Sequence, residues 1–392
     1  MRKKIINSCL IILLILSSGC WSSLNINDTA VCSGLGVDIT DTGKISVMVQ
    51  INKSVNPQNE EGKLTEGAFV VVSGSGDSIT EASRKVTLSL PRMPIWSHAD
   101  LFLLGENLVT EDLSILYDFL FRNRNIRKSS YALVANKASL GKIYNSDCPM
   151  ALCSARGILK ILFSQEKNLG IYLPVTIKDF FIMASTPGID PFLPMVTVRK
   201  DLEDKDILTL DGTAIFKNNK MVGDLNETES RGLYWLNTKT AGSCIVVTLS
   251  DNPENKVSLQ ACKINSKIRP RIKDNELVMD ITCNVDFNIT EIIGIVDEED
   301  EELMVKIQNA ANKKVASHIR QAVAKGQKAN SDFLGFGLSI SRYQPKLWEN
   351  IEDDWENRFP SVRTNIEVKS NLLRSNLIFN DVFLVNKKGG KP

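Results

Sequence analysis

The chain has 392 residues, of which 43% are hydrophobic and 24% charged, a composition typical of globular domains with substantial cores. At roughly 100–200 residues per domain, this length predicts two or three domains. The 47 basic and 46 acidic residues give a net charge of +1, which argues against a nucleic-acid binder because such proteins present a strongly basic face.

The first twenty residues, MRKKIINSCLIILLILSSGC, have the organisation of an export signal. Arg2–Lys4 supply positive charge, and the apolar stretch Cys9–Leu16 is far shorter than the roughly 20 helical residues needed to cross a bilayer. The closing residues Leu16–Cys20 resemble a bacterial lipobox, in which the cysteine thiol takes a diacylglycerol and becomes the mature N-terminus. We therefore expect residues 1–19 to be a lipoprotein signal peptide and Cys20 to be the lipidation site. A plain signal peptide with an incidental cysteine is the alternative.

Eight cysteines are present, and six remain when Cys9 and Cys20 are set aside. Six cysteines permit three disulfides, but their scattered spacing and the size of the chain favour reduced thiols in the core. Only His98 and His318 accompany them, which argues against a zinc site, and no metal or cofactor is expected. The six cysteines are Cys32, Cys148, Cys153, Cys244, Cys262 and Cys283.

The first half of the mature chain alternates strand and helix patterns. A helix is expected after Asp77 or Ser78, either of which can act as its N-cap, and another after Thr110. This alternation predicts an α/β layer architecture. The expected strands are Val31–Ile39, Lys44–Ile51, Ala68–Val72, Ala99–Leu104 and Tyr131–Ala135.

Helices are expected between Leu152 and Ser185, with Thr176 capping the second of them. A final strand over Met195–Arg199 precedes the charged run Lys200–Lys205, which we interpret as a linker between domains. The expected domains are therefore residues 20–200 and 206–385.

The second half begins with a hairpin that turns at Asn218–Asn219, followed by a short helix from Asn226 through Trp235. A long helix is predicted after the acidic run Asp297–Glu302, with His318 beside its apolar stripe as a packed or surface residue rather than a ligand or base. The predicted fold class is α+β (mixed α/β), with an N-terminal α/β domain and a C-terminal antiparallel-sheet and long-helix region. The alternating tracts that predict this sheet are Cys244–Leu249, Ser258–Arg269 and Leu277–Thr290, and a last strand contains Glu367 and Val368.

Two further stretches carry a family resemblance. The first runs from Gly212 to Leu233, and the second begins with Asp332–Gly337 and continues to Phe359 and Pro360. Together with the lipobox, they closely resemble the C subunit of bacterial spore germinant receptors, the Ger(x)C lipoprotein family. The resemblance covers essentially the whole mature chain. It departs from the pattern at Leu373–Leu377, where an Arg-Arg pair followed by Gly was expected.

The resemblance implies a lipoprotein on the outer face of the spore inner membrane. It implies two partners, the A subunit and the multi-spanning B subunit of the receptor, and a requirement in the response to small nutrients such as amino acids, sugars or ions. It also implies a mixed α/β fold, in which the C-terminal half can divide into two subdomains.

The aromatic residues of the second stretch allow two interpretations. Trp348, Trp355 and Phe359 are spaced by seven and four, which fits one aromatic face of a helix, and Phe336 lies between two glycines. Phe336, Trp348 and Trp355 are expected either in the domain core or on a surface that docks the partner subunits.

Two other functional classes fit the sequence less well. An enzyme needs a nucleophile with a base, a tuned carboxylate pair or a metal, and two histidines with scattered cysteines offer little of this. A solute-binding lipoprotein of a transporter, the remaining alternative, typically shows repeated βαβ units, which residues 243–290 do not resemble. We therefore expect a non-enzymatic, lipid-anchored subunit of a germinant receptor complex.

Overall fold

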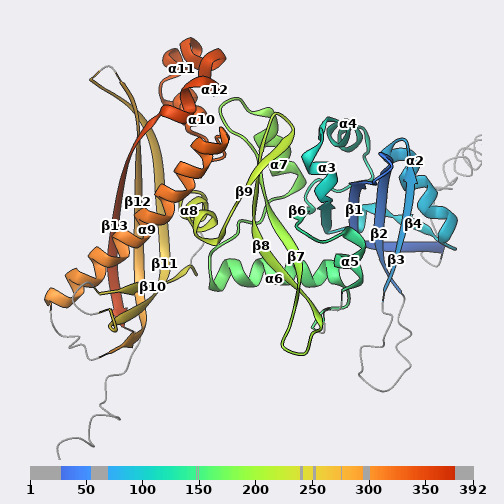
Figure 1. Cartoon of the computed structure of the whole chain (residues 1–392), viewed down its shortest axis with the longest axis horizontal. Helices are drawn as coiled ribbons and strands as arrows, with labels where there is room; N and C mark the ends of the chain where they lie inside the picture. The colour runs from blue at the N-terminus through green and yellow to red at the C-terminus, as the bar shows by residue number, and fades with distance from the viewer. Residues whose placement is uncertain are drawn as a thin grey trace, which may run out of the picture.

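The computed structural model describes residues 28–53, 69–146, 148, 150–238, 242–249, 253–274, 276–294 and 301–375. Cys20, the signal peptide and the polar tail Asn386–Pro392 therefore lie outside the described residues, as do positions 297–300 of the acidic run. The described chain forms a nine-stranded and a four-stranded sheet. Strands β1–β4 and helix α2 lie at one end of the long axis, and β10–β13 with helix α9 lie at the other (Figure 1).

The first sheet has the strand order β3-β2-β1-β5-β6-β7-β8-β9, and β4 pairs with the start of β1. Its centre, from β1 through β7, is parallel, whereas β1–β3 and β7–β9 pair antiparallel. Central strands such as β5 and β6 are apolar throughout because both faces of a parallel centre are covered. The strands are β1 (Thr29–Ile39), β2 (Ile45–Asn52), β3 (Phe69–Gly76), β4 (Met93–Ile95), β5 (Leu101–Leu104), β6 (Tyr131–Ala135), β7 (Phe192–Lys200), β8 (Asp206–Lys217) and β9 (Lys220–Leu225).

Helices cover both faces of this sheet. Phe102 and Leu104 of β5 belong to one core, shared with α2, α4 and α7, whereas Leu101 and Leu103 belong to another, shared with α5 and α6. The expected α/β layer architecture is therefore confirmed, with helices on both faces of the sheet. The helices are α2 (Ile79–Lys85), η2 (Val86–Ser89), η3 (Trp96–His98), α3 (Glu106–Thr110), α4 (Ser114–Arg122), α5 (Leu140–Asn145), α6 (Ser154–Asn168) and α7 (Ile177–Ser185).

Two of the three predicted N-caps in this half are confirmed. The Ser78 hydroxyl caps α2, and Thr176 forms a capping box with Asp179 at the start of α7. The prediction for Thr110 is wrong, because this residue is the last of α3 and its hydroxyl donates to the backbone of that helix. Helix α4 begins four residues later, where the Asp112 carboxylate accepts the N–H of Ser114.

The charged run Lys200–Lys205 is not a linker. It closes the hairpin between β7 and β8, in which Lys200 pairs with Asp206. The Asp201 carboxylate accepts the N–H groups of Glu203 and Lys205 and so stabilises the turn. The first sheet consequently continues across the predicted domain boundary into β8 and β9.

The second sheet has the order β10-β11-β12-β13. The first three strands, β10 (Cys244–Thr248), β11 (Lys256–Lys273) and β12 (Glu276–Ile293), are antiparallel as predicted. The last, β13 (Arg363–Ser375), runs parallel to β12, so the sheet is mixed. Along β12 every second side chain from Met279 to Ile289 is buried, which confirms one packed and one wet face.

The helices of the second half pack on this sheet and connect it to the first. Helix α9 (Glu301–Ala329) buries the predicted stripe from Leu303 to Ile319. Helix α8 (Glu227–Asn237) precedes β10 and packs against α9 (Figure 1). The chain then turns through α10 (Phe336–Tyr343), α11 (Pro345–Ile351), η4 (Glu352–Asp354), α12 (Trp355–Arg358) and η5 (Phe359–Ser361).

Three of the predicted core cysteines, Cys32, Cys153 and Cys283, are buried free thiols. Burial raises the pKa of Cys32 to about 12 and that of Cys283 to about 11. Because the thiolate is the reactive species, these two thiols are chemically inert and serve in packing.

Candidate functional site at the joint between the two sheets

Two groups of contacts join the first sheet to the second, and together we call them the joint. One surrounds Asp332 in the loop between α9 and α10, and the other surrounds Arg231 on α8. Both lie within the stretches that carry the family resemblance.

The Asp332 carboxylate begins helix α10. It accepts the N–H groups of Phe336 and Gly337, each at 2.8 Å, and the indole Nε1–H of Trp355 at 3.1 Å. Gly335 between them has a φ of 72°, a left-handed conformation that glycine adopts without strain. The Asp332–Gly337 motif is therefore a helix-capping loop in which both oxygens of the Asp332 carboxylate have structural partners.

Burial raises the pKa of the Asp332 carboxyl to about 7, against the opposing effect of its N–H donors. Asp190, in the turn before β7, accepts the backbone N–H of Asp332 at 2.7 Å. Burial also raises the pKa of Asp190, and the nearby Lys217 ammonium opposes this rise. Lys217 Nζ lies 3.4 Å from an Asp190 oxygen and 3.1 Å from Glu356, so the cluster links both halves of the chain.

Close backbone packing accompanies these polar contacts. The Gly188 carbonyl accepts the N–H of Leu338 at 2.7 Å. A Cβ atom at Gly337 would lie 2.6 Å from Gly188 Cα and 2.7 Å from the Trp348 ring, which leaves room only for glycine. The α10 end of the joint is thus fixed against the turn that leads into β7.

The three predicted aromatic residues, Phe336, Trp348 and Trp355, are all buried. The Trp348 and Trp355 rings lie 5.6 Å apart, and Phe359 lies 5.9 Å from both Trp355 and Phe336. Trp348, Trp355 and Phe359 do not share one helical face as predicted. They lie on three successive short helices, α11, α12 and η5, instead of one continuous helix. Of the two interpretations, their burial matches the core rather than a docking surface.

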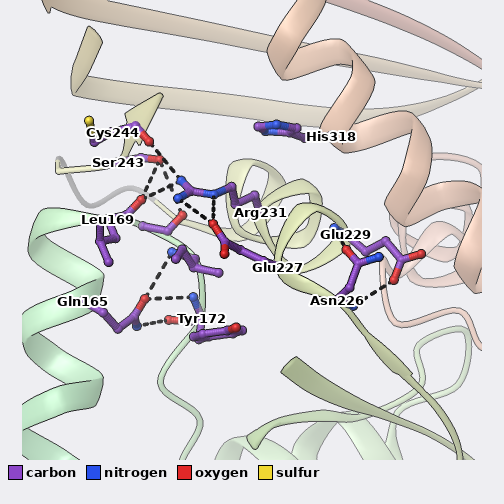
Figure 2. A network of polar contacts seen from close by, with 12 residues as sticks. Gln165, Leu169, Tyr172, Asn226, Glu227, Glu229, Arg231, Ser243, Cys244 and His318 are labelled. Carbon is purple, nitrogen blue, oxygen red and sulfur yellow. Dashed lines mark hydrogen bonds and ion pairs between the residues drawn. The ribbon is translucent and has the colours of Figure 1, made fainter. Parts of the chain in front are cut away.

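Arg231 forms the second part of the joint (Figure 2). Its Nη1 donates to the carbonyls of Leu169, at the end of α6, and Cys244, at the start of β10, at 2.9 and 3.0 Å. Glu227 pairs with the same guanidinium at 3.1 Å, and the Arg231 side chain is only 12% exposed. Asn226 and Glu229 form the capping box of α8.

The bridging role of Arg231 was missed from the sequence. Its visible signal was Glu227 one helical turn before it, which predicts only a surface ion pair. The Ser243 hydroxyl and the Cys244 N–H also donate to the Leu169 carbonyl, each at 3.3 Å. Three donors, one on α8 and two at the start of β10, therefore hold the end of α6 (Figure 2).

The His318 side chain, on α9, packs against α8. Trp235 Nε1 donates to its Nδ1 at 3.2 Å, and burial lowers its pKa to about 4, so the ring is neutral. The prediction of a packed histidine is confirmed.

The geometry of the joint is suited to holding the two sheets together rather than to chemistry. Asp332 and His318 are buried against protein partners and do not line any of the described cavities of about 440–590 Å³. Within the described residues, no three His, Cys, Asp or Glu side chains are grouped to hold a metal ion. None of the described helices is both long enough and apolar enough to span a membrane.

Comparison with known protein families shows which family the chain belongs to. The model of the spore germination protein N-terminal domain matches residues 22–198, and that of the Spore germination B3/GerAC-like C-terminal domain matches residues 211–376. The chain belongs to the Ger(x)C family of spore germination proteins. The boundary between the two matches falls in the β7–β8 hairpin, so the division between the family models does not coincide with a break in the sheet.

Relatives in Bacillus subtilis (strain 168) match over nearly their full length. Spore germination protein KC is 26% identical over 402 residues, covering 97% of this chain and 98% of that protein. Spore germination protein A3 is 23% identical, covering 93% and 95%. The crystal structure of the GerBC protein, at 20% identity, covers 87% of this chain and 97% of that one with a TM-score of 0.57, which confirms the mixed α/β fold.

These comparisons confirm the assignment made from the sequence. The Ger(x)C chain is a germinant receptor subunit that acts in spore germination, and the alternative of a transporter's solute-binding lipoprotein is wrong.

Proposed function

We propose that this receptor subunit is anchored through an acyl group on Cys20 at the outer face of the spore inner membrane. The observation that carries the proposal is the lipobox Leu16–Cys20 directly before the family match, which begins at residue 22. The two or more chains added to a lipobox cysteine give stable membrane attachment, whereas a single chain is marginal.

The proposed role of the anchor is assembly with the A and B membrane subunits of the receptor. Tethering confines the subunit to the membrane plane and raises its effective concentration beside integral partners. In this complex the subunit supports the germination response to small-molecule nutrients. Its own contribution is structural and non-enzymatic, because the ionisable groups of the joint are buried against protein partners.

Substitution of the lipidated cysteine tests the anchor. In spores carrying Cys20→Ala, we expect the protein to leave the membrane fraction and the germination response to weaken or disappear. The matched control is Cys9→Ala, which changes a cysteine within the same leader but leaves the lipobox intact. Full membrane retention and normal germination in the Cys20→Ala strain would refute the proposal.

Purification of the intact receptor with mapped crosslinks tests the partners. The A and B subunits should copurify with the chain and crosslink to it. Recovery of the chain from solubilised spore membranes without either subunit would contradict the proposed assembly.

A further inference from the structure

The described chain begins beside the short strand β4, whose first residue, Met93, is exposed. Thr29, the first residue of β1, pairs with Met93 of β4, and Asp28 before it is exposed. Eight chain steps separate Cys20 from Asp28, and an extended chain spans at most about 3.6 Å per residue, so the tether reaches about 29 Å. An acyl group on Cys20 would therefore hold this end of the molecule close to the bilayer.

The surface around β4 carries exposed apolar side chains. Leu88 on η2 is 84% exposed and Met93 on β4 is 61% exposed. Soluble proteins rarely expose clusters of large apolar side chains such as these. A groove of about 440 Å³ runs between η2 and β4, with Met93 and the partly exposed Trp96 on its lining. We call the surface formed by Arg84, Leu88, Arg92, Met93 and Trp96 the β4 face.

Two arginines lie close in sequence to these apolar groups. Arg84 and Arg92 are exposed, and neither forms an ion pair with another residue of the described chain. Lys85 pairs with Glu81 at 2.6 Å, which cancels that charge locally, and Asp28 and Asp77 are exposed acids in the same part of the chain.

Exposed apolar groups, a partly exposed tryptophan and two unpaired arginines suit the headgroup region of an anionic bilayer. We propose that the β4 face rests on the membrane surface, with Leu88 and Met93 among the headgroups of anionic lipids. The inference rests on the proposed acylation of Cys20, which delivers this face to the bilayer. Because β10–β13 lie at the opposite end of the long axis, the second sheet then projects away from the membrane (Figure 1).

Hydrogen exchange of the acylated full chain tests contact of this face with lipid. The protein is reconstituted in vesicles of phosphatidylcholine with phosphatidylglycerol, and its exchange is compared with the same protein in detergent. We expect slower exchange in residues 84–98 on the anionic vesicles, and no change in the edge strand β13. Equal exchange of 84–98 in both conditions would overturn the proposal.

Vesicle partitioning measures lipid binding by the β4 face in the absence of the acyl anchor. The chain from position 20 onward, which contains every described residue, carries Cys20→Ser and is mixed with phosphatidylglycerol vesicles. Removal of two arginines from an anionic surface lowers partitioning about 30-fold at about 1 kcal/mol each, so R84Q/R92Q should show a loss of this size. The matched control R320Q/R342Q removes the same charge from exposed positions in the second half, where neither arginine forms an ion pair with another described residue, and should bind normally.

The apolar part of the face has its own variant pair. L88D should abolish the protection of 84–98, whereas L202D changes another highly exposed leucine, at the β7–β8 turn, and should not. An equal effect of the test and control variants would overturn the proposal. So would protection that appears only in the assembled receptor, because it would assign the face to a protein partner.

The two proposals fail separately. Release of Cys20→Ala from spore membranes supports the anchor whether or not the β4 face touches lipid. If that variant stays on membranes but its R84Q/R92Q derivative leaves them, the anchor is wrong and the face is right. If the acylated chain stays on vesicles with 84–98 unprotected, the anchor is right and the face is wrong.

Discussion

Gly337→Ala tests whether the joint depends on close packing between its two halves. An added Cβ would lie 2.6 Å from Gly188 Cα and 2.7 Å from the Trp348 ring, well inside normal contact distances. Neither neighbour is the free end of a flexible side chain, so the α10 loop must move. Overpacking of this kind costs about 1–3 kcal/mol, and the backbone contact favours the upper part of that range. Replacing a helical glycine with alanine raises the free energy of unfolding by about 1 kcal/mol, so the net loss of unfolding free energy is about 2 kcal/mol.

The assay is urea denaturation of the mature chain, with Gly141→Ala as a matched control. Gly141 is also helical, but its added Cβ would meet only the Met48 side chain, at an ordinary 3.5 Å. This control should gain about 1 kcal/mol, so the two variants should differ by about 3 kcal/mol. Equal or greater stability of Gly337→Ala relative to Gly141→Ala would refute the packing argument.

Two further predictions concern the polar contacts of the joint. Arg231→Met removes two charge-assisted hydrogen bonds and should lower the free energy of unfolding by about 3 kcal/mol. The control Arg122→Met, at an exposed ion pair, should change it by less than about 0.5 kcal/mol. Similar values for the two variants would contradict the bridging role of Arg231. The unfolding free energy of wild type relative to His318→Gln should fall by about 3 kcal/mol as the pH drops from 6.5 to 4, because only the unfolded chain takes up the proton. Relative to Asp332→Asn it should instead rise by about 4 kcal/mol as the pH drops from 7 to 3.8, because the folded protein holds a proton that the unfolded chain releases. Denaturation at several pH values gives both differences, and flat differences would contradict the burial argument.

Features set by neighbouring residues could be predicted from the sequence. Asn218 and Asn219 both have positive φ angles in the β8–β9 hairpin, as a two-residue turn requires. The cap of α8 depends on Asn226 and Glu229, which are three residues apart, and needs no distant partner. The alternation along β12 likewise reports directly which side chains face α9.

Features set by residues distant in the sequence could not be predicted. A charged run such as Lys200–Lys205 has the composition of a linker and of a hairpin turn alike, and only the pairing of β7 with β8 separates them. The parallel pairing of β13 with β12 depends on where the α10–α12 region returns the chain. For the same reason Arg231 gave no sign of bridging, because its two carbonyl partners lie 62 and 13 positions away.

The mass of its N-terminal peptide shows whether the chain is a lipid-anchored receptor subunit. The protein is purified from spore membranes, digested and analysed by mass spectrometry. We predict an N-terminal peptide that begins at Cys20 and carries a diacylglycerol on its thiol. A peptide that begins elsewhere, or an unmodified Cys20, would contradict the account.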